Sequence, residues 1–153
     1  MSEADTPTEP RELFRYAIEN GLDAENRAVV DELFADSVEV LQPDGPDTMT
    51  PEQIWQQHQV ERAAMPDYTH DIQQVFEDGG MVFAQYTAEA TFENEFVFGP
   101  ETTFEPTGET IDTAGIMQAR VEDGQITGWG AFWNKLDLLQ QAGIVPPMEE
   151  LAD

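Results

Sequence analysis

The chain has 153 residues, no cysteine, and 32 acidic against 6 basic side chains, so its formal net charge is −26. The lack of cysteine excludes disulfides, thiolate metal sites and cysteine nucleophiles, and six scattered cations cannot build a basic surface for nucleic acid. The apolar runs are too short to cross a bilayer and the N-terminus is acidic, unlike a signal peptide. We therefore expect a cytoplasmic protein without a nucleic-acid or membrane partner.

The charge balance favours a halophilic protein. At low salt such a surface repels itself, whereas at about 1 M salt the screening length falls to roughly 3 Å. An acidic disordered chain is the alternative, but apolar periodicity runs through the whole sequence and argues against it. We expect a single folded domain over residues 10–146, preceded by a flexible acidic N-terminus over residues 1–9 and followed by an acidic tail over residues 147–153.

Three helices are predicted in the first half of the chain. The first begins at Pro10 and ends at Asn20-Gly21. Asp23 can cap the second, and a short strand, Ser37–Leu41, and a loop over residues 42–49 follow it. The third helix begins with a capping box at Thr50-Pro51-Glu52-Gln53 and runs to about residue 64.

Long strands dominate the second half. Two pairs are predicted, residues 68–77 with 81–98 and residues 111–121 with 126–133, each joined by a glycine-containing turn, and a short helix over residues 136–143 closes the chain. Alternation places five residues on one face of the second strand: Val82, Ala84, Tyr86, Ala88 and Ala90. Helices followed by an antiparallel meander predict an α+β fold whose curved sheet encloses a pocket.

Four segments carry a family resemblance. They are Met65-Pro66-Asp67, Asp78-Gly79-Gly80-Met81-Val82, Pro106-Thr107-Gly108-Glu109, and the closing strands with the tail Leu138-Leu139-Gln140-Gln141-Ala142-Gly143-Ile144. In this order they resemble the SnoaL-like polyketide cyclase (ester cyclase) family of the nuclear transport factor 2-like superfamily. The resemblance covers nearly the whole chain. It implies a cone in which a curved antiparallel sheet wraps around three N-terminal helices, with a small hydrophobic ligand, no cofactor and a homodimer.

The same resemblance implies catalytic positions near the end of the last strand. Family cyclases use an acidic residue there, and counting back from the tail places it on Asn134, or on Ala131 after a shift of one bulge. The family's histidine position falls near Met117. Asparagine cannot act as a base, although it can donate to a developing oxyanion. The nearest acid, Asp137, is either a displaced general base or, as we favour, the cap of the terminal helix.

Other candidate residues each have a functional and a structural interpretation. His58 on the third helix is either a pocket histidine or, as we slightly favour, a half-exposed residue bonded to an acid, and His70 is expected to be exposed. An aromatic and apolar set is predicted either to line a ligand cavity or simply to form the core: Trp55, Tyr86, Met117 and Trp133. Acidic residues at positions 93, 95, 105 and 112 are expected to be solvated, and no metal site is expected.

Two functions remain open from the sequence. The first is a cofactor-free cyclase, isomerase or hydrolase that binds a small hydrophobic molecule and uses Asn134, Asp137 or His58. The second is a non-catalytic ligand-binding or dimerisation module that has lost the catalytic acid and histidine. In either case we expect a homodimer that pairs through the outer face of the sheet, where Gln85, Thr87 and Gln118 lie.

Overall fold

A computed structural model describes residues 6–43, 45–146 and 149 of the chain. The predicted end segments, residues 1–9 and 147–153, lie largely outside this range, so their expected character stays a prediction. The helices are α1 (Pro10–Tyr16), η2 (Ala17–Leu22), α2 (Arg27–Leu33), α3 (Pro51–Ala64) and α4 (Lys135–Gln141). The strands are β1 (Phe34–Val40), β2 (Thr48–Met49), β3 (Thr69–Asp78), β4 (Met81–Thr91), β5 (Phe96–Gly99), β6 (Thr102–Phe104), β7 (Thr110–Glu122) and β8 (Gln125–Trp133).

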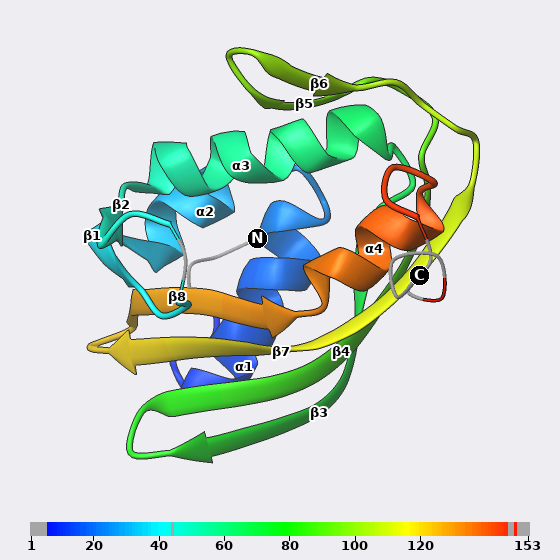
Figure 1. Ribbon diagram of the computed structural model, residues 1–153. Helices are drawn as coiled ribbons and strands as arrows, with labels where there is room; N and C mark the ends of the chain where they lie inside the picture. Colours follow the sequence, from blue (N-terminus) through cyan, green and yellow to red (C-terminus); the bar gives the residue numbers. More distant parts are fainter. Residues whose placement is uncertain (1–5, 44, 147–148, 150–153) are drawn as a thin grey trace.

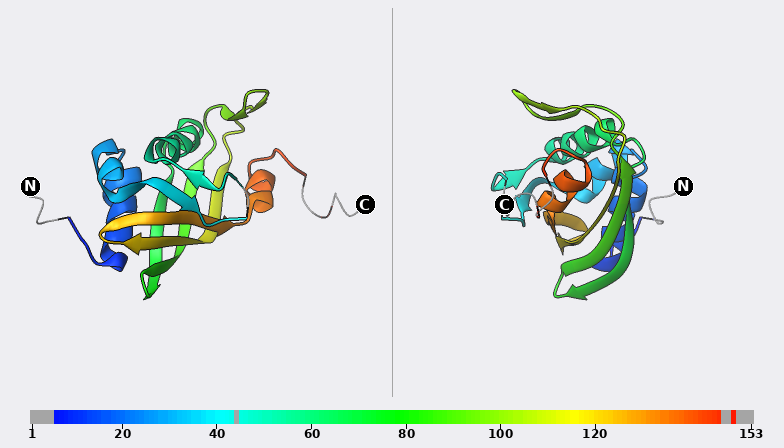
Figure 2. Two further views of the ribbon diagram at one scale, coloured as in Figure 1. Left: turned by 90° about the vertical axis from the view of Figure 1, so that its left-hand side faces the viewer. Right: turned by 45° about the vertical axis from the view of Figure 1, so that its right-hand side comes forward.

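Six strands form one sheet in the order β2-β1-β8-β7-β4-β3. The sheet curves around α1, α2 and α3, and α4 packs against β7 near the end of the sheet (Figures 1 and 2). The expected α+β cone is therefore confirmed. The sheet is antiparallel except that β1 pairs with β8 in parallel, which the meander pattern did not predict.

Local sequence signals account for the main elements. Asp123 and Gly124 have φ angles of 52° and 77°, the left-handed backbone of the hairpin turn predicted between β7 and β8. Thr50 and Gln53 form the predicted capping box at the start of α3. The inward face of β4 is buried as the alternation requires, with its five residues between 0% and 3% exposed.

Three local predictions were wrong. The first helix does not end at Gly21, because a π-helical turn continues it to Leu22 while Val29 and Val30 pack against the glycine. The second helix is preceded by Asn26, not capped by Asp23. The strand predicted over residues 81–98 ends at Thr91, because the backbone N–H groups of residues 93 and 94 donate to the carbonyl oxygen of Ala64.

The interrupted strand continues as a separate hairpin. β5 and β6 pair only with each other, and the hairpin lies beside α3, away from the main sheet (Figure 1). Phe96 on β5 and Phe104 on β6 are half-buried against the core. This hairpin therefore adds one more wall to the space between α3 and the sheet.

Candidate functional site

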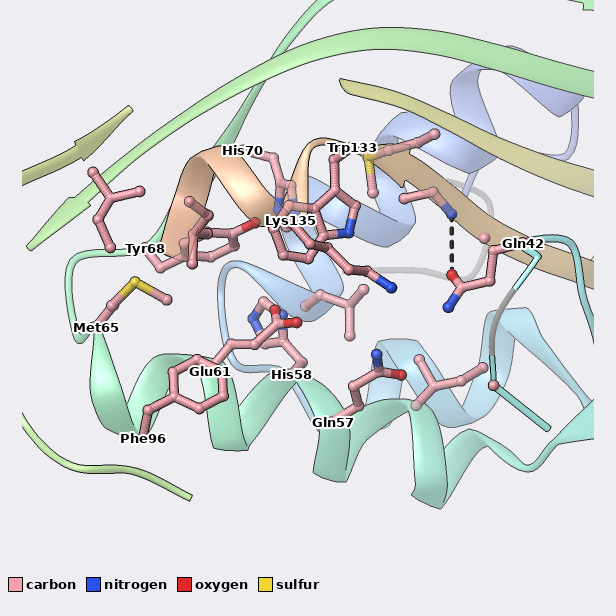
Figure 3. A pocket seen from close by; sticks show the side chains of 18 of the residues that line it. Gln42, Gln57, His58, Glu61, Met65, Tyr68, His70, Phe96, Trp133 and Lys135 are labelled. Carbon is pink, nitrogen blue, oxygen red and sulfur yellow. Dashed lines mark hydrogen bonds between the residues drawn. The ribbon is translucent and has the colours of Figure 1, made fainter. Parts of the chain in front are cut away.

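A cavity of about 400 Å³ lies between α3, the concave face of the sheet and α4 (Figure 3). Its walls are mainly apolar and aromatic, with residues such as Ile54, Met65, Phe92, Ile111, Trp129 and Leu138. A cavity of this size and lining is typical of sites for small organic ligands. Polar side chains enter it from only a few positions, so their chemistry defines what the site can do.

One face of α3 brings two titratable side chains into the cavity. Ile54, His58, Glu61 and Met65 follow one another at spacings of four, three and four residues, which places them on one side of the helix. All four line the cavity, and Figure 3 shows His58 and Glu61 extending into it from the helix. An apolar helix face therefore carries a histidine and a carboxylate where further core residues would be expected.

A third titratable group, His70 on β3, is held by Asp23. Asp23 lies just after η2, and its Oδ1 is 2.9 Å from Nδ1 of His70, while its Oδ2 accepts a hydrogen bond of 2.9 Å from the His70 backbone N–H. Both side chains are almost buried, with 8% and 10% of their surface exposed. The expectation that His70 is exposed was wrong, because this two-point contact turns the ring into the cavity wall.

The contact between Asp23 and His70 selects the protonation pattern of the ring. A carboxylate can only accept, so it favours a proton on Nδ1 and leaves Nε2 of neutral His70 as a proton acceptor. Arg62 on α3 fixes the same loop, because its Nη1 donates to the backbone oxygen of Asp23 at 2.6 Å. The arrangement fixes the orientation of the His70 ring at the cavity wall.

Glu61 is the carboxylate in the cavity lining whose pKa lies near neutral pH. Burial raises the pKa of its carboxyl from 4.5 to about 7, and the charge of His70 opposes this shift only in part. Near neutral pH the carboxyl is therefore present in both its protonated and its ionised form. A group in that state can donate a proton or accept one, as general acid–base catalysis requires.

His58 differs from His70 although the two rings stack, with centroids 6.2 Å apart. Burial lowers the pKa of His58 to about 4, while the charge of Asp23 and a hydrogen bond with the Leu22 backbone act in the opposite direction. The ring is thus neutral at pH 7. Its Nε2 is buried and has no hydrogen-bond partner within the described part of the chain. The predicted alternative of a half-exposed histidine was wrong.

Two tyrosines complete the polar cluster. The rings of Tyr68 and Tyr86 meet His70 edge-on, with centroids 5.1 Å and 5.4 Å away. Burial and, after it, the charge of Glu61 raise the pKa of Tyr86 to about 12 and move the pKa of Tyr68 in the same direction, so both keep their protons. Gly115 on β7 pairs with Tyr86, and a Cβ there would lie 3.0 Å from the tyrosine ring.

Three of the four predicted ligand-binding residues line the cavity: Tyr86, Met117 and Trp133. Their role in binding stays a prediction. Trp55 is not among the lining residues. It is half-buried on α3, where the guanidinium carbon of Arg27 lies 5.9 Å from its ring centroid. The expectation that Trp55 lines the cavity was wrong, because Ile54 and His58 occupy the face of α3 that points toward the cavity.

The expected catalytic pair at the end of β8 lies outside the cavity lining. Asn134 is exposed and caps α4, its Oδ1 accepting from the backbone N–H of Asp137 at 2.9 Å. Asp137 is therefore not the cap, and its Oδ2 accepts from Nε2 of Gln141 at 2.7 Å. Ala131, the alternative for the acid, does line the cavity but has no titratable group. Asn134 and Asp137 therefore lie outside the cavity lining, and their catalytic role stays a prediction.

Sequence reasoning missed Asp23 and Glu61. A signal for Glu61 existed, because it follows Ile54 and His58 on the same predicted helix face. Asp23 gave no comparable signal, since it meets His70 across 47 positions of the sequence. Within the described ranges no group of three or more histidine or carboxylate side chains could hold a metal ion. No helix in the described part of the chain is long and apolar enough to span a membrane.

The fold and the cavity define a member of the nuclear transport factor 2-like class of α+β cones. The model of the SnoaL-like domain family matches residues 14–129. This match covers more than half of the chain, which therefore belongs to the SnoaL-like family. No curated protein sequence matches it.

Solved structures share the whole fold at low sequence identity. A proposed SnoaL-like polyketide cyclase from Jannaschia sp. CCS1 has 16% identity and a TM-score of 0.77, covering 96% of this chain and 99% of its own. AclR from Streptomyces galilaeus, a proposed hydroxylase, has 16% identity and a TM-score of 0.73, covering 92% and 100%. A proposed polyketide cyclase from Acidithiobacillus ferrooxidans has 24% identity and a TM-score of 0.70, covering 94% and 98%. Such likeness establishes the fold, and the chemistry must be argued from the site.

Proposed function

We propose that this protein binds a small hydrophobic carbonyl compound in the cavity and catalyses proton transfer on it, as a cofactor-free cyclase or isomerase. The observation that carries the proposal is the pairing of two groups in one apolar cavity: His70, oriented by Asp23, and Glu61, whose pKa lies near 7. A base and an acid held together in a mainly apolar cavity are what enolisation requires.

In the proposed reaction, Nε2 of His70 removes a proton from the carbon next to the carbonyl group. The electron pair of that C–H bond moves toward the carbonyl oxygen, which becomes an enolate. Protonated Glu61 or the hydroxyl group of Tyr86 donates to this oxygen, and donors of this kind typically contribute a few kcal/mol to stabilising the transition state. The enolate carbon then attacks a second carbonyl carbon, which closes a ring, and protonated His70 returns its proton to the new alkoxide oxygen. In the isomerase alternative, protonated His70 returns the proton to the far carbon of a conjugated dienolate, and the double bond shifts.

Exchange of deuterium into 2-tetralone tests the proposal, because this flat apolar ketone has acidic protons beside its carbonyl group. We expect the wild type to accelerate exchange in D2O, measured by proton NMR, and His70→Gln to lose the acceleration. Asn134→Ala, altered outside the cavity lining, is the matched control and should exchange like the wild type. Binding of 2-tetralone without accelerated exchange would favour the non-catalytic binding module. A lack of binding would contradict the proposed ligand class.

We also propose that the protein functions at high salt. The net charge of −26 supports this, since close carboxylates repel one another strongly only where salt does not screen them. We expect the melting temperature to rise steadily from low salt to about 2–3 M KCl. A melting temperature independent of salt would contradict a halophilic origin.

We further propose a two-fold homodimer that forms through the outer face of the sheet. Four large apolar residues on β3, β4, β7 and β8 support it: Phe76, Phe83, Ile116 and Phe132, which are 39% to 62% exposed. Phe76 pairs with Phe83 and Ile116 with Phe132 across neighbouring strands, so the exposed apolar side chains are grouped. Light scattering at molar salt should give twice the monomer mass, and a monomer at micromolar concentration would contradict the dimer.

A further inference from the structure

Lys135 is the only lysine of the chain, and it lines the cavity. Four of the five arginines form ion pairs with acidic side chains away from this lining: Arg15, Arg27, Arg62 and Arg120. Among the described lining residues, Lys135 is the one lysine or arginine and Glu61 the one carboxylate. The cavity thus has a charge balance unlike that of the surface, where acids greatly outnumber bases.

The lysine contacts Trp133, which lies two residues before it on the chain. Its Nζ lies 5.7 Å from the centroid of the Trp133 ring, which is a cation–π contact. Figure 3 shows Lys135 reaching into the cavity from the start of α4, while Gln57 reaches in from α3 on the other side. An ammonium group and a side-chain amide therefore enter the same region of a largely apolar space.

The position of Lys135 is not explained by helix stability. Lys135 is the first residue of α4, where the helix dipole disfavours a positive charge. The position is understandable if the ammonium group serves the occupant of the cavity.

We propose that Lys135 forms an anion subsite, so that the cavity selects an apolar molecule that carries a carboxylate over its neutral ester or amide. The inference rests on the proposed function, because it names the class of substrate for the same cavity. The apolar body of the ligand lies against the aromatic walls, its carboxylate accepts from Nζ of Lys135, and the amide of Gln57 is a second donor in reach of that region. Charge-assisted hydrogen bonds of this kind are about twice as strong as neutral ones.

Because the protein surface is strongly acidic, a measured preference for a carboxylate over its ester would be evidence for a local anion site. The many surface carboxylates repel any anion at low salt, so a preference for one requires local groups that attract it. At about 2 M KCl the screening length falls below roughly 3 Å, which removes the long-range repulsion. A contact between Lys135 and a ligand within the cavity is screened much less, and binding is therefore best measured there.

Calorimetric titration with 2-naphthoate and methyl 2-naphthoate at about 2 M KCl tests the proposal. We expect the wild type to bind the acid more tightly than the ester, and Lys135→Met to weaken binding of the acid by about tenfold or more with the ester little changed. Lys135→Arg should keep the preference. Arg11→Gln, which removes the same charge from an exposed position on α1, is the control and should bind like the wild type.

The outcomes separate this inference from the proposed function. If the ester binds as tightly as the acid, or if Lys135→Met weakens both equally, the anion subsite is wrong while the apolar ligand site stands. If Arg11→Gln weakens the acid as much as Lys135→Met does, net charge and not Lys135 governs binding, and the proposal fails. If neither probe binds, the anion subsite and the apolar ligand site both fail.

Discussion

Two walls of the cavity differ in how they use their polar residues. At the wall formed by α3 and β3, His58 is buried and Glu61 and His70 are partly buried. All three line the cavity, and the remote Asp23 holds His70. At the junction of β8 and α4, Asn134 and Asp137 serve the helix itself, one as its cap and the other as a partner of Gln141. The difference shows that polar residues near a cavity are functional candidates only when the helix ends do not already engage them.

Breaking the contact at the first wall should have the largest effect. In Asp23→Asn the amide can donate to Nδ1 of His70, which moves the ring proton to Nε2 and abolishes the base. We expect the exchange rate of 2-tetralone to fall by about 100-fold or more. Nitrogen NMR of the imidazole should show the change of tautomer directly.

The second wall supplies the control for this variant. Asp137→Asn also replaces a carboxylate by an amide, but its neighbour is Gln141 and it lies outside the cavity lining. Its exchange rate should match that of the wild type. Equal losses of exchange rate in Asp23→Asn and Asp137→Asn would mean that the contact between Asp23 and His70 has no special role in proton transfer.

The acidity of Glu61 should appear as a pH dependence of stability. Because the pKa rises from 4.5 to about 7 on folding, the folded state keeps a proton that the unfolded state releases within this window. Its contribution to stability is therefore fully present below the lower value and is lost as the pH rises through the upper one. Glu61→Gln removes this loss.

Relative to the wild type, Glu61→Gln should gain roughly 3 kcal/mol of unfolding free energy between about pH 4 and pH 8. Chemical denaturation of both proteins across this range measures the gain. Glu89→Gln, at an exposed position on β4, is the control and should follow the wild-type curve. Parallel curves for Glu61→Gln and the wild type would show that the Glu61 carboxyl is solvated.

The smallest effect is expected at the second wall. Asn134→Ala removes the side-chain cap of α4 and should lower the unfolding free energy by about 1 kcal/mol. Denaturation measures this loss, and calorimetry should find the affinity for 2-tetralone unchanged. A loss of ligand affinity without a loss of stability would show that Asn134 contacts the ligand and does not cap α4. The contrast between the two walls would then be wrong.

Local signals in the sequence were sufficient for most of the fold. The capping box at Thr50, the turn at Asp123-Gly124 and the alternation along β4 each depend on residues close together in the chain, and all three are present in the structure. The end of β4 could not be predicted in this way, because it depends on a distant residue. The backbone N–H groups of residues 93 and 94 donate to the carbonyl oxygen of Ala64 on α3.

The site was less predictable for the same physical reason. The contact between Asp23 and His70 joins residues 47 positions apart, and no local pattern encodes it. Counting from the tail located Asn134 along the chain, but the count could not show that α4 begins there and uses the amide as its cap. Glu61 was within reach of sequence reasoning, since it shares a helix face with Ile54 and His58.

The central claim is that the wall of α3 and β3 holds a proton-transfer centre, and the titration of Glu61 tests it most directly. Carbon NMR of the glutamate carboxyl groups, assigned by comparison with Glu61→Gln, measures this pKa without reference to any substrate. We predict that the Glu61 signal titrates with a pKa of about 7 and that bound 2-tetralone shifts it. A titration in the ordinary glutamate range, near about 4.3, with no response to 2-tetralone would contradict the account.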